Sequence, residues 1–257
     1  MFSKTIDSLG VELECGISNQ KLQYLSRKYS PTHRYEVHSD GSVSVNPHAS
    51  NWVPNAEITY NSDRKADLYE FFEDAFRDNE RLGALTNRTT GMHCHIHSNV
   101  SFMWQWSYAV TVHRFLAAYK SQYHDIPKYM NRLVNEYSKG RYSESAAVDQ
   151  IRLNFKNSAR RYAVNLNAYS INPSRGTFEI RILPGMDNAA EAIKSIEWLT
   201  KTIDDINLHP NKTIVFKRES SNKIPRAPAS EFSEFANSLK SELERAGIRV
   251  KNRGDTH

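Results

Sequence analysis

The sequence predicts an α+β fold in which helices cover one face of an antiparallel sheet. Two patterns carry this prediction: short segments alternate polar and apolar residues with the period of a β-strand, and longer segments repeat apolar residues with helical spacing. The strand-like segments are residues 11–15, 56–60, 91–97, 162–166 and 177–181. If these segments share one sheet, one face is core and the other face is polar.

The polar face of this predicted sheet gathers acids, histidines and an arginine. Residues 91–97 read GMHCHIH, so three imidazoles share one face and apolar side chains share the other. Residues 11–15 separate two carboxylates from three apolar side chains in the same way. The residues expected on the polar face are Glu12, Glu14, Glu57, His93, His95, Glu179 and Arg181.

An ordinary solvated face would explain any one of these strands, because antiparallel sheets often keep one side wet. The set is unusual as a whole, since it carries Glu, His, Asn and Arg but no Lys. At an effective dielectric of about 20, Glu12 and Glu14 alone would repel by roughly 2 kcal/mol. Several such repulsions would cancel much of a folding stability of about 5–15 kcal/mol. The pattern therefore predicts a divalent cation that offsets the repulsion. Carboxylates with an occasional imidazole suit Mg²⁺ or Mn²⁺.

The first part of the chain is expected to continue with a helix and a turn. A short helix is predicted over residues 21–29, ending before Pro31. Residues 33–45 are predicted as one or two strands around a turn at 39–41, which suits a hairpin. Asp40 in this turn has two explanations that fit equally well, a simple Asx-type turn and an acidic turn that belongs with the strand of Glu57.

Three longer helices are expected to pack on the apolar face of the sheet. The first is predicted to be capped by Ser62 or Asp63 and to end at Gly83. The second is predicted to be capped by Ser101, and the third by Asp187. The apolar stripes of all three predict core packing rather than cofactor contacts.

The remaining segments are expected to lie beside or beyond this domain. Residues 124–160 predict one or two helices at the edge of the site, either a solvated insertion or a substrate-facing lid. Residues 220–228 are typical of a linker, and an amphipathic helix is expected after them. The predicted division is therefore a main domain over residues 1–212 and a linker with a basic C-terminal helix and tail over 213–257.

Composition limits the protein classes that remain. No apolar stretch approaches the roughly 20 residues needed to span a bilayer. Cys15 and Cys94 are the only cysteines, which predicts a reducing compartment such as the cytoplasm. Of the formal charge of +5, most belongs to the segment from His209 onward, where ten Lys or Arg face six Asp or Glu.

Four motifs, in matching order and spacing, resemble those of the amidoligases, which are carboxylate–amine ligases distantly related to glutamine synthetase and glutamate–cysteine ligase. The motifs are GVELE at 10–14, GMHCH at 91–95, RYAVNLN at 161–167 and TFEIR at 177–181. The resemblance covers residues 8–205, and relatives of this kind occur in bacteria and phages. One departure concerns Glu57, which is followed here by Ile58-Thr59-Tyr60 where the family has an apolar residue, Ser and Pro.

The resemblance implies a curved antiparallel sheet with helices on its outer face, that is, a glutamine-synthetase-like catalytic domain over residues 1–212. It implies an ATP-dependent ligase that joins a small-molecule or peptide carboxylate to an amine through an acyl phosphate, with Mg²⁺ or Mn²⁺ as cofactor. The implied residues are the metal ligands Glu12, Glu14, His93 and Glu179, the nucleotide-binding residues His95, Asn165 and Arg181, and the catalytic residues Arg181, Glu57 and Arg161.

Two other functions stay open from the sequence. His93, His95 and His97 at alternate positions could bind zinc in a hydrolase, with a carboxylate as general base, but this leaves Arg181 without a role. A nucleic-acid-binding protein could use the basic tail on phosphates and aromatic residues as stacking platforms. The chain has no glycine-rich phosphate loop, which favours a phosphate site made of metal and arginine.

Overall fold

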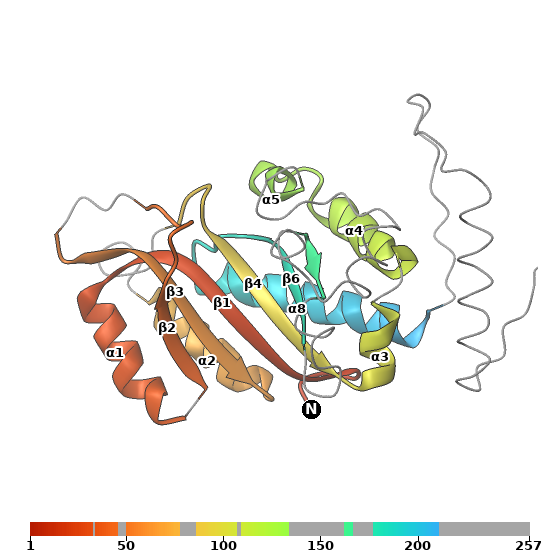
Figure 1. Ribbon diagram of the computed structural model, residues 1–257, viewed down its shortest axis with the longest axis horizontal. Coiled ribbons are helices and arrows are strands. Elements are labelled where there is room, and N and C mark those ends of the chain that lie inside the picture. Colours follow the sequence, from red (N-terminus) through yellow and green to blue (C-terminus); the bar gives the residue numbers. More distant parts are fainter. Residues whose placement is uncertain are drawn as a thin grey trace, which may run out of the picture. The chain divides into compact units, whose positions relative to one another are not determined.

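The computed structural model describes residues 1–32, 34–45, 50–77, 86–106, 109–133, 162–166 and 177–210. Six strands in this part of the chain form one open antiparallel sheet, ordered β2-β3-β1-β4-β6-β5, with helices packed against it (Figure 1). The predicted α+β class with an antiparallel sheet is therefore confirmed. All described residues belong to the first of two units into which the chain divides, Met1–Thr213.

Five strands correspond to the segments predicted from alternation, and the sixth, β2, lies within residues 33–45, which were predicted to form one or two strands. They are β1 (Ile6–Ser18), β2 (Tyr35–Ser39), β3 (Trp52–Ser62), β4 (Gly91–Ser98), β5 (Val164–Asn165) and β6 (Phe178–Pro184). Strand β1 lies at the centre, paired with β3 on one side and β4 on the other. The predicted strand over 162–166 shortens to the two residues of β5 at the edge of the sheet.

The register brings the polar residues of different strands side by side. Because side chains alternate between faces, residues paired directly across strands share a face. The cross-strand neighbours on the polar face are Glu12 and His93, Glu14 and Glu57, His95 and Glu179, and Asn165 and Glu179.

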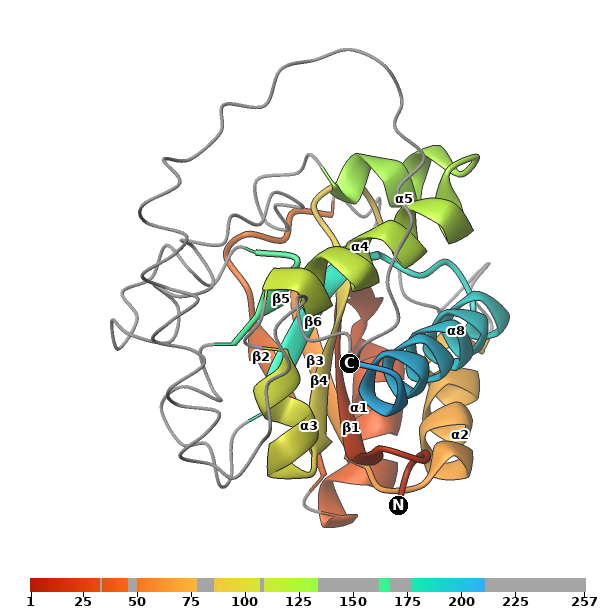
Figure 2. The ribbon, with the colours of Figure 1, turned by 90° about the vertical axis from the view of Figure 1, so that its right-hand side faces the viewer.

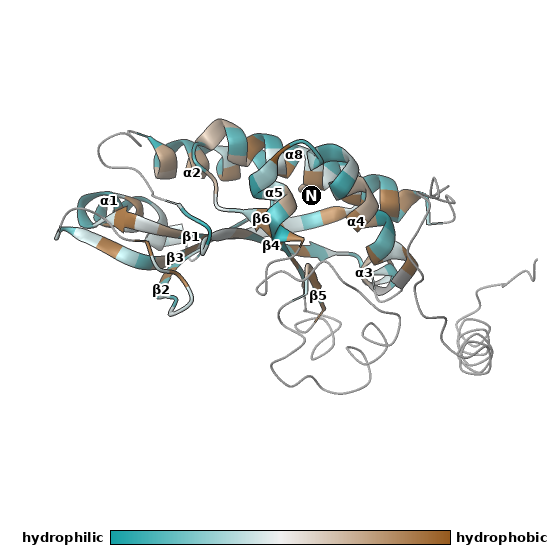
Figure 3. Ribbon diagram, turned by 90° about the horizontal axis from the view of Figure 1, so that it is seen from above, coloured by the Kyte–Doolittle hydropathy of each residue, from teal (hydrophilic) through white to brown (hydrophobic). Residues whose placement is uncertain are grey.

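The helices are α1 (Asn19–Tyr29), α2 (Lys65–Phe76), α3 (Val100–Gln105), α4 (Ala109–Tyr123), α5 (Pro127–Arg132) and α8 (Ala189–Leu208), with a 3₁₀ turn, η1 (Ser30–Thr32), after α1. Seen from above, α2 and α8 run along one side of the sheet (Figure 3). Figure 2 shows α2 beside α8, and these two helices are in contact.

The core lies between this helical layer and the apolar face of the sheet. Phe72 of α2 and Leu199 of α8 are fully buried, as are Ile58 and Ile180 of the sheet. Trp106, which follows α3, stacks on Phe178 of β6 with ring centroids 4.5 Å apart. The predicted core role of the helical stripes is therefore confirmed for the described residues. Both cysteines are buried and free.

The predicted start of the first long helix is wrong, because α2 begins after Arg64. The Ser62 hydroxyl is instead occupied in the turn, where it accepts from the backbone N–H of Arg64 at 3.0 Å. Asp63 forms an ion pair with Arg34 at 3.0 Å. The helix ends at Phe76, earlier than predicted.

Two further caps also differ from the prediction. Ser101 lies inside α3, where its backbone N–H donates to Asn99 at 3.0 Å, and the expected single helix is divided into α3 and α4. The cap of α8 is Asn188, whose side chain accepts from a backbone N–H in the first turn. Asp187 binds Lys128 at 2.7 Å instead. In each case a neighbouring polar residue provides the cap.

The predicted turn after β2 forms, but the strand that pairs with β2 lies farther along the chain than residues 43–45. Asp40 accepts hydrogen bonds from the backbone and the hydroxyl of Ser42 at 2.7 and 2.8 Å, which is the predicted Asx-type turn. Strand β2 pairs with β3. Val43 and Val45 in the connection are buried without joining a strand.

A β-bulge in β6 lies beside the polar residues of β4. Between two regular pairs, Arg181 and Ile182 of β6 together oppose the single residue His93. The carbonyl group of Arg181 accepts a hydrogen bond from Arg132 Nη2 at 2.9 Å, and that of Ile182 accepts one from the Tyr119 hydroxyl at 2.9 Å. Side chains from two helices therefore hold the bulge.

Several predicted segments lie outside the described residues: the rest of the 124–160 region beyond residue 133, the linker and the C-terminal helix and tail. The boundary predicted at 212 stays a prediction. Among the helices of the described residues, none has the length and apolar character required to cross a bilayer.

Helices α1 and α2 are joined through the buried carboxylate of Asp74. It accepts from the hydroxyls of Tyr29 and Tyr24 at 2.6 and 3.0 Å and from Lys28 at 2.5 Å. Burial acts to raise the pKa of Asp74, but these hydrogen bonds outweigh it and hold the pKa below its ordinary value.

We expect Asp74→Asn to lower the free energy of unfolding by about 2–4 kcal/mol at neutral pH, measured by urea denaturation. Because the folded-state pKa is depressed, the carboxylate stabilises the fold above its unfolded pKa, and this contribution is lost as pH falls through the folded pKa. The difference between variant and wild type should therefore shrink in acid.

The matched control is Glu70→Gln, which removes an exposed partner of the same Lys28. Exposed ion pairs contribute little, so this variant should keep wild-type stability. Equal losses in the two variants, or an Asp74→Asn deficit that stays constant with pH, would contradict the role given to the buried carboxylate.

Candidate metal centre

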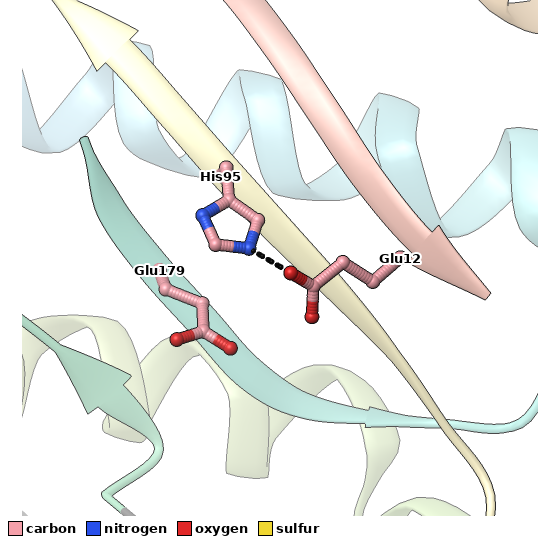
Figure 4. A group of neighbouring side chains, drawn as sticks. All are labelled: Glu12, His95 and Glu179. Carbon is pink, nitrogen blue, oxygen red and sulfur yellow. Dashed lines mark hydrogen bonds and ion pairs between the residues drawn. The ribbon is translucent and has the colours of Figure 1, made fainter. Parts of the chain in front are cut away.

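Two groups of acids and imidazoles form on the polar face of the sheet, and their candidate ligand atoms lie within 4.8 Å of one another in each group. The first group contains Glu12 of β1, His95 of β4 and Glu179 of β6, whose side chains converge from three adjacent strands (Figure 4). The second group contains Glu14 and Glu57, which are directly opposed in β1 and β3, with Asp40 from the turn after β2.

His93 lies between the two groups and is only 1% exposed. Its Nδ1 is 3.0 Å from Glu12 Oε2 and 3.4 Å from Glu179 Oε1, while its Nε2 is 3.5 Å from Glu14 Oε1. The contact with Glu14 lacks hydrogen-bond geometry, so within the described residues the buried Nε2 has no hydrogen-bond partner. An imidazole nitrogen in this state is a suitable metal ligand.

The negative charge of the first group is partly offset by hydrogen bonds from the two histidines that contact Glu12. Burial acts to raise the pKa of Glu12, but hydrogen bonds with His93 and His95 outweigh it and bring that pKa below its usual range. Burial acts to lower the pKa of His95, but the Glu12 hydrogen bond and the charge of Glu179 raise it overall. Glu12 is therefore stabilised as a carboxylate, and His95 as a cation beside it.

In the second group, the surroundings of Glu14 and Glu57 disfavour their negatively charged forms. Burial raises the pKa of Glu14, although the nearby charges of His93, Arg132 and Arg181 oppose this shift. Burial also raises the pKa of Glu57, and the negative charges of Glu12 and Asp40 add to the effect. Each raised pKa means that its environment disfavours the carboxylate form.

Glu179 is oriented by two neighbours on the polar face. Asn165 of β5 donates from its side-chain amide to Glu179 Oε2 at 2.6 Å. Arg181, two residues along β6, donates from Nη1 to Glu179 Oε1. Both side chains are partly or fully buried, so the carboxylate is held within the site.

The structure brings most of the predicted site residues into one neighbourhood. Those that converge are Glu12, Glu14, Glu57, His93, His95, Asn165, Glu179 and Arg181. Arg161 lies outside the described residues. His97 is turned to a different neighbour, with its Nδ1 3.8 Å from Asp7, and it belongs to neither group.

Two residues of this neighbourhood were missing from the predicted ligand set. Asp40 was not placed in the ligand set, because a simple Asx turn explains its sequence context as well as the acidic turn that precedes the strand of Glu57 in the amidoligases. Arg132, at the end of α5, is brought to the polar face by contacts with residues distant in sequence. No local pattern marks an arginine at the end of a short helix as part of a site.

The donor set fits a divalent cation that prefers oxygen. Carboxylate oxygens outnumber imidazole nitrogens in the two groups, which is the ligand chemistry of Mg²⁺ and Mn²⁺. The carboxylates of the two groups also outnumber the arginines Arg132 and Arg181 that adjoin them. A bound cation would offset this surplus of negative charge.

Comparison with known proteins gives no assignment: no protein-family model matches the chain, and no curated protein matches it. The resemblance carried by the four motifs therefore stays a proposal.

We expect Glu57→Gln to stabilise the metal-free protein, because it removes one of two directly opposed carboxylates. The gain in the free energy of unfolding, measured by urea denaturation with a chelator present, should be about 1–3 kcal/mol. Added Mn²⁺ should stabilise the wild type more than the variant, because ligand binding to the folded state shifts the unfolding equilibrium.

Glu36→Gln is the control, since Glu36 is an exposed acid on β2 of the same sheet and belongs to neither group. It should leave stability unchanged with or without Mn²⁺. Should Glu57→Gln lower the stability of the chelated protein, the acids of the second group are not in electrostatic conflict.

Proposed function

We propose that this chain is an ATP-dependent carboxylate–amine ligase that forms an amide or isopeptide bond through an acyl phosphate. The observation that carries the proposal is the convergence of Glu12, His95 and Glu179 on one face of the sheet, with Arg181 beside them. Acids and imidazoles supply a metal site, and the guanidinium supplies a permanent positive charge next to it.

The chemistry of amide formation explains why these groups belong together. A free carboxylate resists attack by an amine, because its carbon is electron-rich and its leaving group would be oxide. Transfer of the γ-phosphoryl group of ATP converts the carboxylate to an acyl phosphate, from which the amine then displaces phosphate. When bound, Mg²⁺ or Mn²⁺ would neutralise charge on the phosphate oxygens.

Burial separates the roles proposed for the two histidines. His93 is buried between the acidic groups, which supports a role as metal ligand with Glu12, Glu14 and Glu179. The side chain of His95 is 28% exposed, which supports a place nearer the phosphates of the nucleotide. Its cationic form would attract those phosphates.

Arg181 is proposed to stabilise the transferred phosphoryl group. Its guanidinium stays charged throughout the pH range of the protein, and its planar fork matches phosphate oxygens. Hydrogen bonding to Glu179 holds it at the edge of the first group. Asn165 is proposed to act with Arg181 at the nucleotide. Glu57 is proposed to complete the second cation site. Arg161 is the remaining proposed catalytic residue and lies outside the described residues.

The proposed fold is that of a glutamine-synthetase-like catalytic domain. An open antiparallel sheet with buried helices on one face and acids on the other supports this assignment. The proposed substrates are a small-molecule or peptide carboxylate and an amine.

The rival zinc hydrolase receives less support. His93 and His95 share Glu12 as a neighbour, but His97 contacts Asp7 and is absent from both groups of candidate ligand atoms. A three-histidine zinc site needs all three imidazoles on one ion. Metal analysis separates the two functions, because stoichiometric zinc and hydrolysis without ATP would favour the hydrolase.

We expect the purified chain to release ADP and phosphate only when Mg²⁺, a carboxylate and an amine are all present, in a screen of pooled carboxylates and amines. Glu179→Gln and Arg181→Ala should each lower this rate by about 100-fold or more, since each removes a group that stabilises developing charge.

The controls are Glu70→Gln and Arg34→Ala, which change the same residue types at exposed ion pairs away from the polar face. They should keep the wild-type rate. Full activity in both Glu179→Gln and Arg181→Ala would refute the assignment.

A further inference from the structure

The buried cation of Arg132 is the part of this neighbourhood that the proposed chemistry does not use. Arg132 is the last residue of α5 and is 4% exposed. Helix α5 lies outside all four motifs on which the ligase proposal rests. Burying a guanidinium is unfavourable unless nearby groups compensate it, so the groups around Arg132 indicate what it does.

Gly91, the first residue of β4, marks the place where Arg132 meets the acidic face. A Cβ atom built on Gly91 would lie 2.6 Å from Arg132 Nη2 and 3.1 Å from Glu14 Oε2. The guanidinium and the carboxylate therefore both lie next to the position that a side chain on Gly91 would occupy. A side chain at this position would displace one or both of them, so glycine is required for this approach.

The same guanidinium also holds the bulge of β6. Arg132 Nη2 donates to the carbonyl of Arg181 at 2.9 Å, at the point where Arg181 and Ile182 oppose His93. A bulge changes the direction in which its residues project. Arg132 thus forms a hydrogen bond with the backbone segment that sets the direction of the Arg181 side chain, and it also lies near the Glu14 carboxylate.

A structural role at the bulge would not by itself need a charge. The neighbouring carbonyl of Ile182 is satisfied by the neutral hydroxyl of Tyr119. The positive charge of Arg132 suits the buried Glu14 carboxylate that adjoins the same Gly91, because an opposite charge nearby offsets the cost of burying a carboxylate. Arg132 therefore makes one contact that a neutral donor could also make, with the Arg181 carbonyl, and one interaction that uses its positive charge, with Glu14.

We propose that Arg132 is a positioning residue of the metal centre, which holds Glu14 as a ligand for a divalent cation and fixes the bulge that aims Arg181. The proposal rests on the metal centre of the proposed function and adds a residue that none of its motifs contains. Arg132 acts through Glu14 and Arg181 and does not itself contact the cation.

The test is Mn²⁺ binding to the full chain, measured by electron paramagnetic resonance of the free ion. Arg132→Met should weaken Mn²⁺ affinity about 10–100-fold, the usual effect of removing a group that orients a metal ligand. Arg132→Lys keeps the charge without the fork, so it should recover part of this loss.

The matched control is Arg114→Met on α4. Arg114 is also buried, and it also donates to a backbone carbonyl, that of Pro210 at 3.1 Å. It belongs to neither acidic group. This variant should lose stability while keeping wild-type Mn²⁺ affinity.

A double-mutant cycle with Glu14→Gln separates positioning from a general structural effect. If Arg132 acts through Glu14, Arg132→Met should weaken Mn²⁺ binding far less in the Glu14→Gln background than in the wild type. Equal weakening in both backgrounds would overturn the proposal.

The remaining outcomes are also decisive. Absence of Mn²⁺ binding in the wild type would overturn the metal centre itself, whereas wild-type affinity in a folded Arg132→Met variant would overturn only the positioning role. If circular dichroism shows that Arg132→Met does not fold, Arg132→Lys and Gly91→Ala take its place. Gly91→Ala should weaken affinity by displacing the guanidinium, and unchanged affinity in both would refute the proposal.

Discussion

The register of β1 between β3 and β4 is the constraint on which the site depends. Side chains alternate between faces, so a slip of one residue would place Leu13 on the polar side and Glu12 and Glu14 in the core. The buried side chains of Val11 and Leu13 oppose such a slip, because it would expose them to water and bury two carboxylates. The apolar face thus fixes where the acids lie, although it contributes no group to the site.

The two acidic groups that result are balanced in different ways. In the first, His93 and His95 contact Glu12 and bring its pKa below the ordinary range. In the second, burial dominates and the pKa of Glu14 and of Glu57 is raised. Among the described residues, the arginine from outside the sheet whose charge acts on Glu14 is the buried Arg132. The second group is therefore the one whose charge a bound divalent cation would relieve most, and its carboxylates oppose folding while no cation is bound.

The parts of this architecture that follow from local periodicity could be predicted from the sequence, and those that follow from distant contacts could not. Alternation located five of the six strands and the face of their polar residues, because parity needs only neighbours in the chain, and the predicted turn at 39–41 located β2. Predicted helix caps were wrong where a residue distant in sequence binds the capping side chain instead. Asp187 forms an ion pair with Lys128, and Asp63 forms one with Arg34. The bulge and the role of Arg132 could not be predicted for the same reason, since the hydrogen bond from Arg132 to the Arg181 carbonyl joins residues 49 positions apart.

His93 shows how the two groups are linked through one side chain. Its Nδ1 contacts Glu12 and its Nε2 faces Glu14, so one ring spans both groups. A neutral imidazole has one donor and one acceptor, whereas the protonated ring donates at both nitrogens. A neutral ring that donates from Nδ1 to Glu12 keeps its lone pair at Nε2, on the side of Glu14. One side chain therefore joins the two groups, because the same ring contacts Glu12 through Nδ1 and faces Glu14 through Nε2.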